Sequence, residues 1–308
     1  MISNNLRGAF FALAGFGAFS LHDAVVKALG GYYAPVQIVF FSALFGFPLV
    51  ALVLIGQGSG GLRPVHPWWN ALRTLALMVV MLSAFYAFAT IPFAQAYALI
   101  FATPLIITAL SVPMLGERVG PRRWAAVVLG LLGVLIVLRP WGEAHLAPGH
   151  LAALFSAFAG ALVALIMRKI GNAERSAVFL LYPMLANVVV MGAVLPLVYE
   201  PMPILHLGGM ALVALGSVTA MGLIILAYRA GEAVVVAPMQ YSQMLWAIGL
   251  GYLVFGERVD GATLAGSAVI ALSGLGILWR EGQLPPSSAR PALHGRARPD
   301  PAPSNGPE

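Results

Sequence analysis

The sequence contains no cysteine and very little charge. Without cysteine the chain has no disulfide, no thiolate nucleophile and no Cys-ligated metal. Only 9% of its 308 residues are charged, compared with about 25% in soluble globular domains. Hydrophobic residues make up 60% of the chain. A chain this apolar cannot cover its surface with polar groups, so we predict an all-α integral membrane protein.

Several functional classes lack their sequence patterns here. There is no phosphate-binding loop, no nucleophile triad and no cluster of metal-ligating residues. The net charge of +6 comes from basic residues in short connections and in the tail, not from one face, which disfavours nucleic acid as a partner. We therefore expect no catalytic residues, no metal and no cofactor, and a lipid bilayer as the main surrounding.

Ten apolar stretches are long enough to span a bilayer, at about 20 residues each. Short turns with Gly and Pro separate them. From residue 283 onward the chain is rich in proline and has almost nothing to bury, so residues 283–308 are expected to form a disordered tail. The predicted spans are Gly8–Leu29, Val36–Ile55, Ala71–Ile91, Phe93–Met114, Arg123–Leu138, His150–Ile170, Ser176–Val198, Leu207–Tyr228, Ala233–Phe255 and Ala262–Trp279.

The basic residues predict the orientation of the chain. If the N-terminus is cytoplasmic, 14 of the 17 lysines and arginines lie in cytoplasmic segments, and only Lys27, Arg139 and Arg258 lie outside. Cytoplasmic loops carry an excess of Lys and Arg in membrane proteins. We therefore expect a multi-pass protein of the inner (plasma) membrane with both termini in the cytoplasm.

The four letters GERV occur twice, at residues 116–119 and 256–259. A shift of about 140 residues also places Lys27 on Lys169, so each half holds five predicted spans. Because five is odd, the halves enter the membrane from opposite sides. Such inverted repeats are typical of secondary transporters, whose substrate site lies near the midplane. We predict two five-helix repeats, at residues 6–140 and 145–280.

Three segments carry a resemblance to a known family: "FSLHDAVVKALGGYYAPVQIVFF", "PFAQAYALIFATPLIITALSVPMLGERV" and "GEAVVVAPMQYSQMLWAIGLGYLVFGERV". Together with the repeat they resemble the EamA repeats of the drug/metabolite transporter (DMT) superfamily, over about residues 6–280. The resemblance implies ten helices around a central cavity, with the fifth and tenth helices peripheral. Family members often carry an arginine where this chain has Ser42, so substrate inferences that rest on that arginine do not transfer.

Asp23 and Lys27 are the charged residues of the first span. They stand one helical turn apart and can pair. A carboxylate at membrane depth costs roughly 2.5–3.5 kcal/mol on insertion scales, so Asp23 requires a partner, a proton or water. The neighbouring His22 can titrate near neutral pH. We expect Asp23, His22 and Lys27 to serve coupling or gating, with protons as a candidate coupling ion. The alternative is an ion pair that only satisfies itself.

Uncharged polar residues cluster in the ninth span, in "APMQYSQMLW". Gln240 and Gln243, at i and i+3, are predicted to share a face near the span's centre. With Tyr241 and Trp246 they would supply amides and an aromatic wall for a substrate. The alternative is a set of hydrogen bonds that hold the bundle together. The third and fourth spans add four further candidates: Tyr86, Tyr97, Phe101 and Thr103.

The two GERV glutamates, Glu117 and Glu257, stand between consecutive spans. We expect them to complement the N-terminal dipole of the next helix.

The sequence predicts a secondary transporter that moves small organic metabolites by alternating access. The substrate is expected to be aromatic or heterocyclic (riboflavin-like) or derived from an amino acid. A passive channel or facilitator and an integral membrane enzyme are the alternatives. A channel would show a polar stripe on several helices, whereas an enzyme would show clustered His, Asp and Glu at one membrane face.

Overall fold

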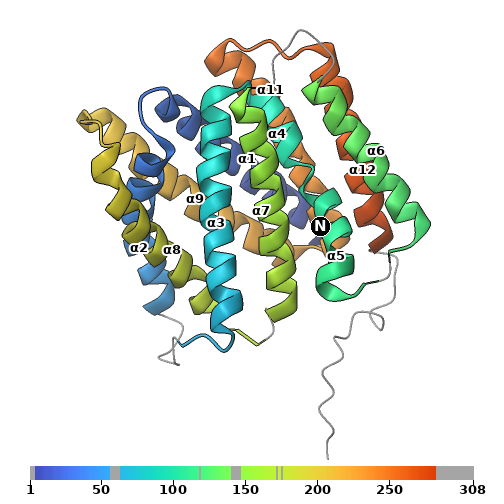
Figure 1. The fold of residues 1–308 in the computed structure, drawn as a ribbon, viewed down its shortest axis with the longest axis horizontal. Coiled ribbons are helices and arrows are strands. Elements are labelled where there is room, and N and C mark those ends of the chain that lie inside the picture. The colour runs from blue at the N-terminus through green and yellow to red at the C-terminus, as the bar shows by residue number, and fades with distance from the viewer. Residues whose placement is uncertain are drawn as a thin grey trace, which may run out of the picture.

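The computed structural model describes residues 4–55, 63–117, 119–139, 147–170, 173–174 and 176–281, and these contain helices and no strand (Figure 1). The predicted tail, residues 283–308, lies outside the described residues. The α-helices are α1 (Asn4–Gly30), α2 (Pro35–Ile55), α3 (Pro67–Thr90), α4 (Phe93–Ile100), α5 (Thr103–Leu115), α6 (Pro121–Leu138), α7 (Pro148–Ile170), α8 (Ser176–Val194), α9 (Ile204–Ala230), α10 (Ala233–Val236), α11 (Ser242–Phe255) and α12 (Gly261–Glu281); the 3₁₀-helices are η1 (Leu195–Leu197) and η2 (Ala237–Tyr241).

Seven stretches of described helix are long and apolar enough to cross a membrane, with α4 and α5 taken together as one. Two shorter apolar stretches lie in α2 and α12. The helices occupy the places of the ten predicted spans. Several begin earlier than their apolar stretch, because a proline stands at the first helical position, where its missing N–H costs nothing. Pro67 of α3 and Pro121 of α6 are examples.

Two of the predicted spans are broken near their middle. The fourth consists of α4 and α5, which meet at Phe101 and Ala102. Pro104 has no N–H to donate to the carbonyl of Ile100, and the hydroxyl of Thr103 donates to that oxygen instead, at 2.6 Å. The ninth consists of α10, η2 and α11, with a proline in the 3₁₀ segment. The breaks leave irregular backbone at membrane depth, which is tolerated where protein or a cavity surrounds it.

The helices pack in pairs that join the two halves of the chain. In Figure 1, α3 and α7 run side by side in front, with α1 and α9 packed together behind them. At one side α6 packs against α12, and at the other α2 packs against α8. The peripheral position of α6 and α12 agrees with the expectation for the fifth and tenth spans.

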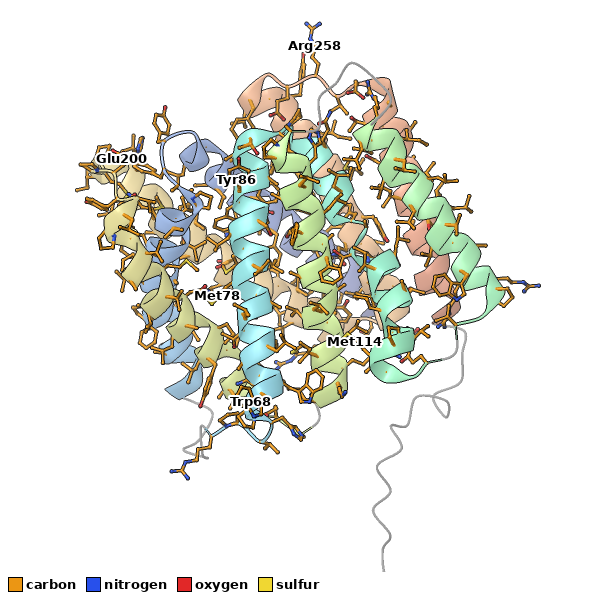
Figure 2. The ribbon with its side chains drawn as sticks, viewed as in Figure 1. Trp68, Met78, Tyr86, Met114, Glu200 and Arg258 are labelled. Carbon is orange, nitrogen blue, oxygen red and sulfur yellow. The ribbon has the colours of Figure 1, made fainter. Side chains whose placement is uncertain are left out.

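Arg258 and Trp68 mark opposite ends of the bundle in Figure 2. The end near Arg258 includes the end of α1, the start of α4 and the end of α11. The end near Trp68 includes the starts of α1 and α3 and the ends of α5 and α7. We call these the Arg258 end and the Trp68 end.

Candidate functional site

Lys27 is held by an ion pair and two hydrogen bonds. Its ammonium lies 2.9 Å from the carboxylate of Glu257 and donates to the carbonyls of Phe88 at 2.8 Å and Ile91 at 2.9 Å. The ring of Phe255 lies 5.4 Å from the same nitrogen. The two charged side chains are only 10% and 20% exposed. This ion pair therefore joins α1, the end of α3 and the turn after α11 at the Arg258 end.

The second carboxylate oxygen of Glu257 accepts the backbone N–H of Phe93, at 2.7 Å. Phe93 is the first residue of α4, so the negative charge lies at the positive end of that helix. The expectation that Glu257 complements the N-terminus of the next helix, α12, is thus wrong: it complements that of α4. Asp260 occupies that place and accepts the N–H of Thr263 at 2.7 Å.

A related ion pair lies at the Trp68 end. Glu117, the other GERV glutamate, lies 2.9 Å from the guanidinium of Arg168 at the end of α7. Arg168 is next to Lys169, the residue on which Lys27 falls when the sequence is shifted by 142 residues. Each GERV glutamate therefore binds a basic residue from the last turn of the first helix of the other half. This pair is more exposed than Lys27–Glu257, with side chains 49% and 28% accessible.

The GERV glycines shape both turns in the same way. Gly116 and Gly256 have φ of 69° and 65°, in the left-handed region that glycine adopts without strain. The N–H of Glu117 reaches the carbonyl of Ser111, and the N–H of Glu257 reaches that of Gly251. Both helices thus end in the same glycine-terminated motif, which aims each glutamate back toward the bundle.

Asp23 does not pair with Lys27, contrary to that alternative. Its carboxylate accepts a hydrogen bond from the hydroxyl of Tyr97 on α4, and its other oxygen lies 2.7 Å from Nδ1 of His22. The His22 ring packs 6.1 Å from the ring of Phe85 on α3. Ser20, one turn earlier on α1, is fully buried and contacts the side chain of Tyr97. The carboxylate is held by a phenol and an imidazole.

Tyr97 also begins a run of aromatic rings toward the breaks in the fourth and ninth spans. Its ring lies 5.7 Å from that of Phe101, which lies 5.5 Å from that of Tyr241. Phe101 and Tyr241 are 140 residues apart, so the two breaks meet through equivalent residues. We call His22, Asp23, Tyr97, Phe101 and Tyr241 the polar-aromatic cluster. The hydroxyl of Tyr241 is buried against α12, where a Cβ at Gly274 would lie 1.6 Å from it, and it has no hydrogen-bond partner in the part of the chain that the structure describes.

The remaining predicted residues lie in different surroundings. Gln243 is 9% exposed, whereas Gln240 lies in η2 and is exposed, so the two amides do not share an environment. Trp246 packs on α1, because a Cβ at Gly17 would be 3.1 Å from its ring. Tyr86 is 38% exposed and points away from the face of α3 that carries Phe88. The hydroxyl of Thr103 is taken by Ile100, as described above.

Sequence reasoning missed Glu257 and Arg168 as partners of residues in the opposite half. The signal was present, since the GERV turn and the basic end of the first helix are both repeated.

The fold and the ion pairs between its halves define a multi-pass helical membrane protein. The sequence model of the EamA-like transporter family matches residues 6–139 and again residues 147–279. The chain belongs to the EamA-like transporter family, which confirms the resemblance found in the sequence. That family consists of transporters, in agreement with the expectation that the protein is not an enzyme.

Curated relatives match nearly the whole chain. An S-adenosylmethionine uptake transporter of Rickettsia conorii is 26% identical over 278 residues, covering 90% of this chain and 94% of the relative. A riboflavin transporter of Rhizobium johnstonii is 27% identical over 275 residues, covering 88% and 90%. A pseudopaline exporter of Pseudomonas aeruginosa is 25% identical over 271 residues, covering 86% and 94%. Relatives of similar identity thus include both uptake and export proteins.

A protein of known crystal structure has the same fold. It superposes with a TM-score of 0.59 at 19% identity, covering 91% of this chain and 99% of that chain.

Proposed function

We propose that this protein is a secondary transporter that moves a small organic metabolite by alternating access between two inverted five-helix halves. The observation that carries the proposal is the pair of related ion pairs at opposite ends, Lys27–Glu257 and Arg168–Glu117. A site between two similar halves opens to one side when one pair breaks and the other holds. A protein that only bridges the membrane does not require matched closures at both ends.

The packing of the helices supports the inverted repeat. The first helix of each half packs against the third helix of the other, as α1 on α9 and as α7 on α3. The second helices pack together, as do the fifth. Exchange of the two halves leaves this pattern unchanged, as a two-fold axis in the membrane plane requires.

The substrate would bind beside the polar-aromatic cluster, between the two ends. Flat rings at Phe101 and Tyr241 suit an aromatic or heterocyclic substrate, and Asp23 suits an amine or a proton. The relatives named for S-adenosylmethionine and riboflavin support compounds of this kind. Gln243, buried on α11 two residues after Tyr241, is the amide that we assign to substrate binding. His22 would relay protons to Asp23 if transport is coupled to a proton gradient.

The distribution of basic residues supports an orientation of the protein in the membrane. The Trp68 end would face the cytoplasm with both termini, and the Arg258 end would face outward, in the inner membrane. A cleft of about 350 Å³ lies at the Trp68 end, between the start of α1 and the end of α9. Arg7 and Arg229 line it. The more exposed Arg168–Glu117 pair is at this end, so we expect the cytoplasmic side to open with less cost.

Counterflow in proteoliposomes tests the proposal. Vesicles loaded with one unlabelled compound from a panel of nucleosides, flavins and amino-acid derivatives are diluted into a trace of the same labelled compound. A transporter accumulates label transiently above its equilibrium level, whereas a channel only equilibrates. The Asp23→Asn variant should retain counterflow but lose accumulation driven by a pH gradient. An unchanged gradient response in Asp23→Asn would exclude Asp23 as the proton carrier.

A further inference from the structure

Three polar residues on α3 are buried with open hydrogen-bonding capacity. Asn70, Arg73 and Thr74 are 1%, 7% and 8% exposed. Both amide atoms of Asn70, the Nε of Arg73 and the hydroxyl of Thr74 have no hydrogen-bond partner within the described part of the chain. At spacings of i, i+3 and i+4 the three side chains share one face of the helix. They lie in the first two turns of α3, toward the Trp68 end.

Among the described residues, the guanidinium of Arg73 is bound by Phe179. One Nη donates to the carbonyl of Phe179 on α8 at 3.1 Å, and the ring of Phe179 lies 4.5 Å from the guanidinium carbon. The ion pairs among the described residues do not include Arg73. Glu174, which precedes α8, gives one carboxylate oxygen to the N–H of His66 at 2.6 Å. A guanidinium has five N–H donors, so Arg73 has donors to spare, and its buried charge has no counter-ion among the described residues.

The fold itself does not require polar residues at these positions. In the other half the residues 140 positions later are Met210, Val213 and Ala214, which are also buried. At these three positions the equivalent helix α9 thus carries apolar side chains. The polar residues of α3 are a property of one half, and burying them costs free energy unless they bind something.

We propose that Asn70, Arg73 and Thr74 bind the carboxylate group of an organic substrate. The planar guanidinium matches a carboxylate with two parallel N–H bonds, and the amide and hydroxyl add donors beside it. This inference rests on the proposed transport function and narrows its substrate class to compounds that carry a carboxylate, such as amino-acid derivatives. It adds three residues that sequence reasoning had not included in the site.

The same face of α3 connects this site with the polar-aromatic cluster. Met81, two turns beyond Arg73, accepts a hydrogen bond from Asn187 of α8, and Phe85 contacts His22. From Arg73 to Phe85 the helix rises about 18 Å. A metabolite of amino-acid size does not span that distance. A transported substrate would therefore occupy the carboxylate site and the place beside Asp23 in succession.

Benzoate is the probe that tests the inference. The thermal midpoint of the purified protein is measured against sodium benzoate, with uncharged benzamide and sodium chloride at matched ionic strength as comparisons. Benzoate should raise the midpoint in a saturable way, whereas benzamide should not. Arg73→Gln should weaken benzoate binding roughly tenfold or more, because a charge-assisted hydrogen bond is lost. Arg63→Gln, which removes an exposed arginine at the same end, should bind benzoate like the wild type.

Asn70→Asp is a second variant that tests the inference if Arg73→Gln does not fold. It places a carboxylate next to Arg73, so it should raise the midpoint without added anion and abolish the benzoate response. A wild-type response to benzamide equal to that to benzoate would overturn the inference, as would full benzoate binding in Asn70→Asp. Chloride that saturates the response as effectively as benzoate would make this an inorganic anion site and overturn the carboxylate assignment. Counterflow without any benzoate response would sink this inference alone, whereas benzoate binding without transport of any compound would sink the proposed function alone.

Discussion

Replacing Glu257 with glutamine isolates the charge of the Lys27–Glu257 pair. The amide keeps the size of the side chain and can still accept the N–H of Phe93. What disappears is the negative charge 2.9 Å from a lysine that is only 10% exposed. Removing one partner of a buried ion pair costs about 3–5 kcal/mol. Because Lys27 keeps its bonds to two carbonyls, we expect the low end of that range, about 3 kcal/mol.

The assay is a double-mutant cycle on unfolding free energy in detergent. Lys27→Met alone should also destabilise, since it leaves Glu257 with only the N–H of Phe93. Lys27→Met combined with Glu257→Gln should recover much of the loss, with a coupling energy of about 2 kcal/mol. Arg258→Gln is the matched control, because Arg258 projects away from the bundle (Figure 2) and its loss should cost less than about 0.5 kcal/mol. Additive losses in the double variant, or a Glu257→Gln cost no larger than that of Arg258→Gln, would refute the reasoning.

Three further predictions follow from particular contacts. Gly133→Ala should lower the free energy of unfolding by about 1–3 kcal/mol, because a Cβ there would lie 2.8 Å from the carbonyl of Gly266 on α12. Gly276→Ala is the control in the same unfolding assay, because a Cβ at Gly276 has nothing within 4 Å. Gln243→Leu should weaken substrate binding roughly 5- to 150-fold, from the loss of about 1–3 kcal/mol, with little change in melting temperature; near-normal affinity with a lowered melting temperature would make Gln243 a structural residue. Burial alone would raise the pKa of Asp260, but hydrogen bonds from Thr263 and the charge of Arg139 outweigh it and hold that pKa below its ordinary value. The stabilisation by Asp260 is therefore complete above the ordinary carboxyl pKa and disappears as pH falls through the lowered one, below about pH 4; a melting curve for Asp260→Asn that declines in acid as steeply as that of the wild type would contradict this.

The helices and their places along the chain could be predicted from the sequence, because length and apolar composition dictate them in a membrane. The boundaries that differ are those where a proline extends a helix beyond its apolar stretch, as at Pro121. The breaks in the fourth and ninth spans were only partly predictable. A proline such as Pro104 inside an apolar stretch favours a bend. The 3₁₀ segment that carries Gln240, in contrast, depends on how α10 and α11 pack against α1, which no period in the sequence specifies.

The partners of charged residues were harder to predict than the helices. Spacing along α1 allowed Asp23 to pair with Lys27, and both side chains can reach that geometry. Asp23 instead binds Tyr97, and Lys27 binds Glu257. Which partner each residue has depends on which helix faces it, a property of the tertiary packing. The repeated GERV turn could have indicated these partners. Because the turn occurs in both halves, each GERV glutamate is expected to have an equivalent basic neighbour in the other half. The polar face at Arg73 had no counterpart in the repeat and gave no such signal.

Reciprocal accessibility of a cysteine placed in the centre of the bundle tests the central claim most directly. The chain has no cysteine of its own, so Ser20→Cys, beside the polar-aromatic cluster, is the single target for an impermeant thiol reagent applied to one side of oriented vesicles. Alternating access predicts that Glu257→Gln increases labelling from the side of the Arg258 end and decreases it from the other. Glu117→Gln should do the reverse. If both substitutions change labelling from the same side, or if each raises labelling from both sides at once, the two ion pairs are not alternate closures of one transport path.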